Sequence, residues 1–365
     1  MRILFLIKSL ALSGGGAEKV LSLVSTGLAD RGHAVNVLTF DGPETPDFHA
    51  TGELVRRTFL GLGNAQKKSG PMVTMRRVAA IHRAASRFGP DVAIGFMHSA
   101  FIPLSLALLN SGIPVIGSER TSYDHYRSRP VERFLLRFSA PCLAAMTVND
   151  EQVRSGFPDE LAKRMTVVPN PVLTARRFAD PIGPGAKTLL CVGGLRAEKD
   201  HSTLLLAFAR VAGRFTDWKL KIIGDGPLIE PLRRQITALG LSHQVELPGA
   251  SRRIDEEYER AQLFVLPSIY EAFPNSVAEA LAHGLPSIGF ADCPGTNALI
   301  IPGVNGDLAA GSDRVAALAQ SLVKLMNDAS LRSRFAEAAP STMERYSLAA
   351  AVDRWEELLE KVAGS

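Results

Sequence analysis

Two series of short apolar segments alternate with helical patterns along this 365-residue chain. Each apolar segment is followed by a turn and then by a stretch in which apolar residues recur every three or four positions, a pattern typical of a strand followed by an amphipathic helix. Such alternation builds parallel sheets with helices on both faces, the doubly wound α/β architecture. The strands are expected at residues 2–7, 35–40, 90–99, 112–117, 144–149 and 165–172, and then at 188–192, 219–223, 244–249, 263–266 and 286–290.

A stretch without periodicity separates the two series. Residues 173–186 contain Gly-Pro and Pro-Gly steps and are expected to form a linker. A chain of this length suits two domains. We therefore expect an N-terminal Rossmann-like domain at 1–172 and a C-terminal Rossmann-like domain at 187–345. Residues 346–365 are expected to form a helix that packs back towards the N-terminal domain through Trp355, Leu358, Leu359 and Val362. Residues 41–70 read as a loop with room for one further strand.

Composition excludes several classes of protein. A content of 46% hydrophobic and 21% charged residues indicates a folded globular protein. Three widely spaced cysteines without a C-x-x-C pair suggest reduced thiols in a cytoplasmic protein, and no zinc-ligand spacing is present. The apolar segment at 2–7 is too short for a secretory signal. The longest apolar stretch, 101–117, is interrupted by polar residues and prolines, so no transmembrane helix is expected.

Positive charge is concentrated in the first half. Residues 1–180 contain 22 Lys and Arg against 15 Asp and Glu, whereas residues 181–365 contain 19 against 22. A basic amphipathic helix at 71–88 and a basic, aromatic run at 123–137 suit an anionic membrane or a lipid diphosphate. A surface helix packed on its own sheet and simple solubility explain them as well. No nucleic-acid motif accompanies these charges, so nucleic acid is not an expected partner. The polar face of the helix is expected to hold Arg76, Arg77, Arg83 and Arg87.

A glycine-rich turn follows the first strand. Gly15 and Gly16 precede a helical pattern, so the backbone can approach a ligand closely in front of a helix N-terminus. The spacing is not G-x-G-x-x-G, and no acidic residue ends the second strand before Asp41. A dehydrogenase is therefore disfavoured. A structural tight turn explains the glycines when they are considered alone.

Two carboxylates mark the stretch at 267–284, which follows the strand at 263–266. Glu271 lies in a loop, and Glu279 lies in the first turns of a helix that opens with Phe-Pro-Asn-Ser. The free amides of a helix start can bind a phosphate or a sugar hydroxyl, and a carboxylate can accept two hydrogen bonds from a ribose. Taken singly, each glutamate is also explained by solvation or by the helix dipole.

The combination Glu-x7-Glu, with Phe-Pro between the carboxylates and Ala-Leu-Ala-His-Gly-Leu-Pro after them, resembles the signature of retaining glycosyltransferase family 4. The resemblance extends from Ile3 to about Met326. It implies the GT-B fold, in which two Rossmann-like domains face each other across a cleft, with the acceptor on the first domain and the donor on the second. It also implies transfer from a nucleotide-diphosphate sugar with retention of configuration, without a metal or another cofactor.

The resemblance implies roles for donor-side residues. Glu271 would bind the sugar hydroxyls, Glu279 the ribose, and Lys199 the leaving diphosphate. The arginine of the family pattern is replaced by Gly194, and Arg196 is expected to take over its role. Further donor contacts are expected from Gly15, Gly16, Gly194, Gly224, Pro248, Phe273, Pro274, Asn275 and Ser276. Solvated loop charges would explain Lys199 and Arg196 equally well.

The acceptor side departs from the family pattern. Where the family has a histidine, this chain reads Ser118-Glu119-Arg120, so Glu119 or Arg120 would have to serve. This triplet resembles a subset of the family that builds lipid-linked glycans. His98, Arg120 and Tyr123 are expected to lie near the acceptor.

The sequence therefore predicts a retaining hexosyl- or N-acetylhexosaminyltransferase. Its donor is expected to be UDP-linked and its acceptor a glycan or a polyprenyl-diphosphate-linked glycan, in the synthesis of surface polysaccharide or glycoconjugate. The protein is expected to be cytoplasmic or peripheral on the inner face of the membrane. Two alternatives stay open because Gly194 and Ser118-Glu119-Arg120 depart from the pattern: a sugar-nucleotide 2-epimerase, and a non-catalytic nucleotide-sugar or glycan-binding protein.

Overall fold

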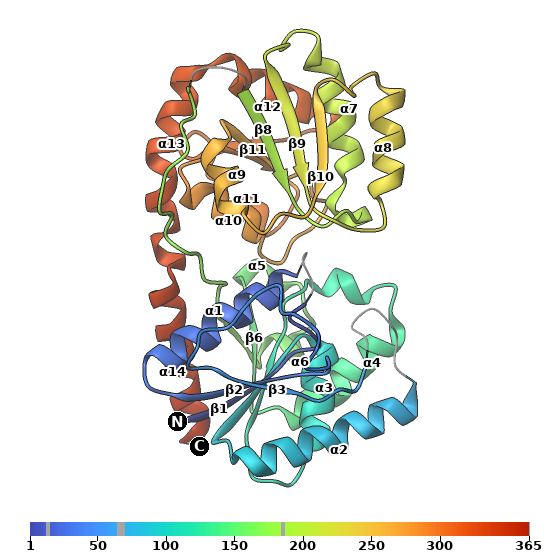
Figure 1. Cartoon of the computed structure of the whole chain (residues 1–365), viewed down its shortest axis with the longest axis vertical. Coiled ribbons are helices and arrows are strands. Elements are labelled where there is room, and N and C mark those ends of the chain that lie inside the picture. The colour runs from blue at the N-terminus through green and yellow to red at the C-terminus, as the bar shows by residue number, and fades with distance from the viewer. Residues whose placement is uncertain (12–14, 64–69, 184–186, 365) are drawn as a thin grey trace. The chain divides into compact units, whose positions relative to one another are not determined.

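The structure, a computed structural model, describes residues 1–11, 15–63, 70–183 and 187–364 (Figure 1). The chain divides into two compact units. The first unit comprises Met1–Pro171 and Leu348–Ser365, and the second comprises Val172–Ser347. Each unit contains one parallel sheet with helices on both faces. The doubly wound α/β class predicted from the alternating pattern is thus confirmed.

The first unit has a seven-stranded sheet in the order β3-β2-β1-β4-β5-β6-β7. The order reverses direction between β1 and β4, and open α/β sheets bind ligands at the carboxyl ends of strands beside such a switch point. Strand β3 occupies part of the segment at 41–70, where the sequence left room for it. The strands are β1 (Arg2–Leu6), β2 (Ala34–Thr39), β3 (Arg56–Phe59), β4 (Val92–Phe96), β5 (Val115–Ser118), β6 (Ala145–Val148) and β7 (Met165–Val167).

Helices cover both faces of this sheet. The N-terminal helix α1 (Gly16–Asp30) lies with the C-terminal helix α14 (Leu348–Ala363) on one face, where Trp355 is fully buried and stacks on Phe96 with ring centroids 6.0 Å apart. Helix α3 (His98–Ala107) lies on the other face, beside α2 (Pro71–Phe88). The remaining elements are η1 (Tyr123–Tyr126), α4 (Pro130–Ser139), η2 (Ala140–Cys142), α5 (Glu151–Ser155) and α6 (Asp159–Ala162).

Helix α2 differs from its predicted amphipathic pattern. Met72 and Met75 on its apolar face are 68% and 74% exposed. Arg77, expected on the polar face, is buried instead, with its guanidinium 4.2 Å from the centroid of the Phe40 ring and its Nε donating to the carbonyl of Leu62. The prediction for Arg77 was wrong because a long side chain can place its charge under a neighbouring loop and still satisfy its donors.

The second unit has a six-stranded sheet in the order β10-β9-β8-β11-β12-β13. Five strands were expected, and β13 is the one that the sequence pattern did not show. It reads Gly-Asp-Leu-Ala, without β-branched or alternating residues, and pairs in parallel with β12. Its glycine is required by packing, because a Cβ on Gly306 would lie 2.0 Å from the carbonyl oxygen of Ser287. The strands are β8 (Lys187–Val192), β9 (Trp218–Ile223), β10 (Val245–Gly249), β11 (Leu263–Val265), β12 (Ser287–Phe290) and β13 (Gly306–Ala309).

Both faces of this second sheet are buried, which explains why its strands are apolar throughout. On β8, Leu189 and Cys191 enter one core, while Leu190 enters the other. The first core is covered by α7 (His201–Ala212), α8 (Ile229–Ala238) and α12 (Arg314–Asn327), and the second by α9 (Ile254–Arg260), α10 (Asn275–Ala282) and α13 (Ala329–Met343). The short elements are η3 (Ala197–Lys199), α11 (Thr296–Leu299) and η4 (Glu344–Tyr346).

None of the helices within the described residues is both long enough and apolar enough to cross a bilayer.

Candidate active site

Loops at the carboxyl ends of β8, β9 and β10 form one continuous edge in the second unit. The backbone N–H of Leu195, after β8, donates to the carbonyl of Asp225, after β9, at 2.9 Å. The N–H of Gly224 donates to the carbonyl of Gly249, at the end of β10, at 3.0 Å. Pro248 precedes Gly249 and is exposed. The predicted donor residues Gly224 and Pro248 therefore lie on neighbouring strand ends.

Of the two glycines at this edge, one is required by the backbone and the other is not. Gly224 has a φ of +158°, and a Cβ there would lie 1.9 Å from the carbonyl oxygen of Gly193, so glycine is required. At Gly194, the nearest atoms to a Cβ are the Nε of Arg196 and the carbonyl oxygen of Asp225, both at 3.8 Å. Packing thus leaves room for a side chain at Gly194. The Arg196 guanidinium lies beside that space. Its expected role in place of the missing arginine stays a prediction.

The two principal predicted catalytic residues contact each other. Lys199, at the end of η3, places its Nζ 2.5 Å from the Oε1 of Glu271 in the loop after β11. The hydroxyl of Ser268 donates to the same oxygen at 2.6 Å. The two loops are joined by the backbone N–H of Ile269, which donates to the carbonyl of Glu198 at 2.9 Å. The side chains of Lys199 and Glu271 are 22% and 10% exposed, so this ion pair is mostly buried and Lys199 is its more accessible partner.

Two further residues support the Glu271 loop. Arg314, on α12, donates to both carboxylate oxygens of Asp292, at 2.6 and 2.8 Å, and to the carbonyl of Ser268 at 3.1 Å. Gly295, with a φ of +36°, approaches so closely that a Cβ would lie 2.7 Å from the carbonyl oxygen of Glu271. The sequence did not identify Arg314, because its contacts are made over more than 20 residues and no motif surrounds it.

Glu279 is held by a tyrosine that the sequence did not identify. The hydroxyl of Tyr258, from α9, donates to the Oε2 of Glu279 on α10 at 3.1 Å. Tyr258 is fully buried, and this burial together with the nearby Glu279 carboxylate raises the pKa of its phenol. Tyr258 therefore stays a hydrogen-bond donor at neutral pH and orients the carboxylate.

The start of α10 lies between the two carboxylates. Phe273 is buried against the ring of Tyr346, with centroids 5.4 Å apart, and Pro274 is the cap residue. Asn275 and Ser276 are the first two helical residues. The first amides of an α-helix make no hydrogen bond within the helix, and helix starts are common anion-binding positions. The expected backbone contacts of Asn275 and Ser276 with a donor stay predictions.

Three titratable groups beneath this edge are held neutral. His201, at the start of α7, is 1% exposed, and neither ring nitrogen has a hydrogen-bond partner. Burial, assisted by the charge of Lys199, lowers its pKa to about 4. Burial raises the pKa of Cys191 to about 12 and that of Cys293 to about 11. Neither cysteine is therefore a thiolate nucleophile at neutral pH.

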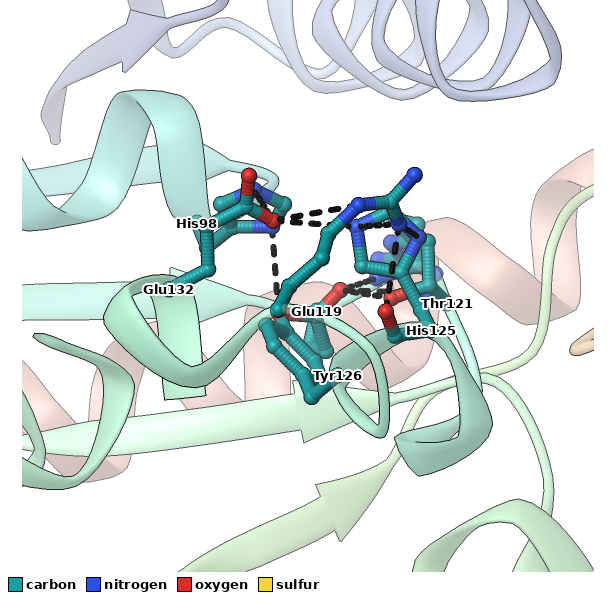
Figure 2. A network of polar contacts seen from close by, with 8 residues as sticks. His98, Glu119, Thr121, His125, Tyr126 and Glu132 are labelled. Atoms are coloured by element: carbon teal, nitrogen blue, oxygen red, sulfur yellow. Dashed lines mark hydrogen bonds and ion pairs between the residues drawn. The ribbon is translucent and has the colours of Figure 1, made fainter. Parts of the chain in front are cut away.

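A separate polar network lies at the carboxyl ends of β4 and β5 in the first unit (Figure 2). Glu119, directly after β5, is fully buried. Its Oε1 accepts hydrogen bonds from the N–H of Arg120 and from the N–H and hydroxyl of Thr121, at 2.9, 3.1 and 2.8 Å. Its Oε2 accepts the hydroxyl of Tyr126, whose oxygen lies 3.0 Å from the Nδ1 of His98. Tyr126 thus connects the predicted residues Glu119 and His98.

Arg120 joins three strands of the first unit. Its Nε donates to the hydroxyl of Ser118 at 2.8 Å, and its Nη1 donates to the side-chain oxygens of Asn149 and, at 2.9 Å, Asn170. Burial lowers the pKa of Arg120 to about 9, while Glu119 opposes the shift, so the side chain is a cation at neutral pH. These contacts give Arg120 a structural role, and its contact with an acceptor stays a prediction.

Of three other predicted site residues, Tyr123 packs beside this network. It is half-buried against Tyr126 and Phe157, with ring centroids 6.0 and 5.2 Å apart. Gly15 is the cap residue of α1 and Gly16 its first residue, so both lie at the carboxyl end of β1. The other members of that turn, Ser13 and Gly14, lie outside the described residues. The expected contacts of Tyr123 with an acceptor and of Gly15 and Gly16 with donor phosphates stay predictions.

Comparison with known families accounts for nearly the whole chain. The model described as Glycosyltransferase Family 4 matches residues 14–176, and the model described as Glycosyl transferases group 1 matches residues 174–342. The chain belongs to glycosyltransferase family 4.

Relatives of known name include a glycosyltransferase and a phosphotransferase. One is the GalNAc-alpha-(1->4)-GalNAc-alpha-(1->3)-diNAcBac-PP-undecaprenol alpha-1,4-N-acetyl-D-galactosaminyltransferase of Campylobacter jejuni, which is 25% identical over 369 residues and 99% of each chain. Another is an exopolysaccharide phosphotransferase of Streptomyces coelicolor, 33% identical over 235 residues. That match covers 63% of this chain but only 24% of the Streptomyces protein.

Solved structures establish the fold of this family 4 member. Sucrose-phosphate synthase from Thermosynechococcus elongatus superposes with a TM-score of 0.85, at 16% identity and over 100% of both chains. HepE from Anabaena, in complex with UDP-glucose, superposes with a TM-score of 0.78, at 19% identity, over 99% of this chain and 100% of HepE. The protein is thus a glycosyltransferase of the GT-B fold, built from two Rossmann-like domains.

Proposed function

We propose that this glycosyltransferase is a retaining enzyme that transfers a hexosyl or N-acetylhexosaminyl residue from a UDP-sugar to a glycan or a polyprenyl-diphosphate-linked glycan. The acceptor class is supported by the Campylobacter relative, whose name specifies an undecaprenyl-linked substrate. Its place would be the synthesis of surface polysaccharide or glycoconjugate.

The observation that carries the proposal is the contact between Lys199 and Glu271 at the carboxyl edge of the second sheet. When the bond between sugar and diphosphate breaks, negative charge develops on the leaving phosphate, and a positioned cation lowers the barrier. Lys199 is already oriented by a carboxylate and still 22% exposed. Arg196 directly precedes η3, the short helix that ends at Lys199. Glu271 is then able to accept hydrogen bonds from the sugar hydroxyls.

Retention is proposed to proceed by attack on the face from which the diphosphate leaves. The acceptor oxygen forms its bond to the anomeric carbon as the bond to the phosphate oxygen breaks, and the phosphate oxygen takes the acceptor proton. Two positive side chains, Lys199 and Arg196, supply the charge that the leaving group needs. We therefore propose that the transfer step uses protein cations in place of a metal ion.

UDP as the leaving group is supported by the complex of HepE with UDP-glucose. Glu279 is the proposed ribose ligand, because Tyr258 fixes its Oε2 and a carboxylate can hold a vicinal diol through two hydrogen bonds. Calorimetric titration of the full chain with UDP, GDP and ADP, without added metal, tests both assignments. We expect micromolar binding of UDP, weakened at least about tenfold in Glu279→Ala. Glu230→Ala, at an exposed position of α8, is the matched control and should bind UDP as the wild type does. Binding of no nucleotide would contradict the proposal.

Turnover assays separate the transferase from its two alternatives. With a lipid-linked glycan acceptor, a transferase releases UDP only when the acceptor is present. A 2-epimerase would isomerise or hydrolyse the donor without acceptor, and a binding protein would release no UDP. The anomeric coupling constant of the product, measured by NMR, then decides between retention and inversion.

A peripheral position on the membrane is supported by helix α4. Val131, Phe134 and Phe138 are 64–68% exposed, and the rings of Phe134 and Phe138 stack with centroids 6.0 Å apart. Two exposed arginines flank this apolar ridge, Arg127 paired with Asp124 and Arg137 paired with Glu160. An apolar ridge beside arginines suits the interface of an anionic bilayer, because aromatic rings enter the headgroup region and cations attract the lipids.

Sedimentation with anionic phosphatidylglycerol vesicles tests this placement. Replacing both phenylalanines, in Phe134→Ser/Phe138→Ser, should weaken vesicle binding at least about tenfold. Leu109→Ser, at a 56% exposed position after α3, is the control. Equal binding of the double variant and the wild type would remove α4 from the membrane contact, while the assignment of the donor site would stand.

A further inference from the structure

Two histidines and a glutamate converge next to the network of Figure 2, from three different elements of the first unit. His98 begins α3, His125 lies in η1, and Glu132 lies in the first turn of α4. The Nε2 atoms of both histidines are 3.4 Å from the Oε2 of Glu132, and the three candidate ligand atoms lie within 4.8 Å of one another. In the part of the chain that the structure describes, this is the only such group of His, Cys, Asp or Glu residues.

The hydrogen bond at the Nδ1 of His98, on the side of the ring opposite Glu132, fixes the tautomer of the neutral imidazole. The Tyr126 oxygen contacts both Glu119 and the Nδ1 of His98, but its hydroxyl has only one proton. A carboxylate accepts and does not donate, so Tyr126 donates to Glu119 and accepts the Nδ1–H of His98. The Nε2 of neutral His98 then directs a lone pair at an oxygen of Glu132. Two acceptors 3.4 Å apart require a proton or a cation between them.

The two separations between histidine and glutamate match those around a small transition-metal ion. Zinc bonds to histidine nitrogen and carboxylate oxygen are about 2.0–2.2 Å long, which in a tetrahedron separates neighbouring ligand atoms by about 3.3–3.5 Å. Both separations from the Glu132 oxygen agree with this value. The oxygen is also buried and lacks a hydrogen-bond partner. Two imidazoles and one carboxylate favour zinc, cobalt or nickel over magnesium or calcium, which prefer all-oxygen sites.

Arg129 competes for the same place. Its Nη1 lies 2.8 Å from the Nε2 of His125, and its Nε lies 3.8 Å from the Oε2 of Glu132. The guanidinium therefore supplies positive charge to the atoms that would bind a metal ion. Its side chain is 45% exposed, so it can withdraw into solvent when another cation binds.

We propose that His98, His125 and Glu132 form a binding site for one zinc-class divalent ion, with Arg129 as the competing cation. Tyr126 and Glu119 orient His98 from behind, as carboxylate-linked partners do for metal-binding histidines. The ion would join α3, η1 and α4 at the carboxyl ends of β4 and β5. Because the three ligands come from separate elements, no local ligand spacing marks the site in the sequence. The inference is independent of the proposed donor chemistry, which uses residues of the second unit.

Titration of the full chain, without a polyhistidine tag, with Co²⁺ tests the site, because tetrahedral cobalt shows strong visible absorption; Zn²⁺ competition then gives its affinity. We expect one ion per chain, and a loss of affinity of at least about thirtyfold in His125→Ala and in the near-isosteric Glu132→Gln. Tyr126→Phe should cost about tenfold, within the range for outer-shell partners. Arg129→Gln should tighten binding several-fold because it removes the competitor.

Two control variants exclude other ligands. His82→Ala removes another partly buried histidine of the same unit, whose Nδ1 lies 3.0 Å from the carbonyl oxygen of Ala107. Cys142→Ser removes the exposed thiol. Both should keep the wild-type affinity. No Co²⁺ binding at about 100 μM, binding that survives Glu132→Gln, or weaker binding in Arg129→Gln would each overturn the proposal. The Arg129 variant keeps the test decisive even if a histidine variant fails to fold, because this side chain is largely outside the core.

Discussion

Each unit has a glutamate between the carboxyl end of a strand and the next helix, and the two glutamates differ in their surroundings. Glu119 is fully buried, and both of its oxygens accept hydrogen bonds from its own domain. Glu271 is 10% exposed, and Lys199 and Ser268 both donate to a single one of its oxygens. The first carboxylate is therefore part of the scaffold, whereas the second can exchange partners with a ligand. Glu119 stands where the family has a histidine. In this chain it holds the hydroxyl of Tyr126, which in turn contacts His98.

The largest effect on activity is expected from the ion pair of Lys199 and Glu271. Lys199→Ala should lower kcat by about 10²–10³, because a positioned charge that stabilises a developing anion contributes on this scale. Release of UDP at saturating donor measures the effect. Lys187→Ala, which removes another ion pair of the same unit, is the control and should keep kcat. A loss of less than about threefold in Lys199→Ala would remove Lys199 from the transfer step.

The scaffold glutamate should affect stability instead. Glu119→Gln should lower the free energy of unfolding by about 3 kcal/mol, because it replaces a buried acceptor that serves four donors and leaves Arg120 without its neighbouring negative charge. Glu271→Gln should lower it by only about 1 kcal/mol, because two donors contact a single oxygen of this carboxylate and glutamine keeps an acceptor there. Urea denaturation of both variants provides the comparison. Equal losses of stability would show that the two glutamates have the same structural role.

His201 should make the second unit sensitive to acid. Its folded-state pKa of about 4 lies below the ordinary value of 6.5, so the unfolded chain binds a proton that the folded chain excludes. The stability that this contributes is complete above about pH 6.5 and is lost as pH falls towards 4, by about 2–3 kcal/mol at pH 4.5. Urea denaturation at pH 7 and 4.5 should show a smaller difference in His201→Phe than in the wild type. An unchanged pH dependence would refute this assignment.

The smallest effect on function is expected from Tyr258, which donates a hydrogen bond to Glu279. Tyr258→Phe removes one hydrogen bond, worth about 1 kcal/mol, and should weaken UDP binding about fivefold with little change in kcat. In the double variant with Glu279→Ala the second change should add almost nothing, because Tyr258 acts through that carboxylate. Additive losses in calorimetry would mean that Tyr258 contacts the nucleotide by another route.

The sequence predicted what a periodic pattern or a family signature can specify. Apolar runs located the strands, and the resemblance to family 4 implied one site for Lys199 and Glu271, although they are 72 residues apart. Strand β13 was missed because Gly-Asp-Leu-Ala has no alternation, and its pairing depends on β12. Tyr258 and Arg314 were missed for a related reason. Their partners lie 21 and 46 residues away, and no local pattern indicates a hydrogen bond across such distances.

The last helix has a consequence for how the protein is made. Trp355 and its neighbours on α14 complete a core whose other members, such as Phe5 and Phe96, leave the ribosome hundreds of residues earlier. The second unit is continuous in sequence, from Val172 to Ser347, and so it can fold while synthesis is still under way. The first unit keeps an unfilled apolar face until α14 has been made. The unit whose sheet comes first in this sequence is therefore the one completed last, and exposed apolar surface of that kind favours aggregation.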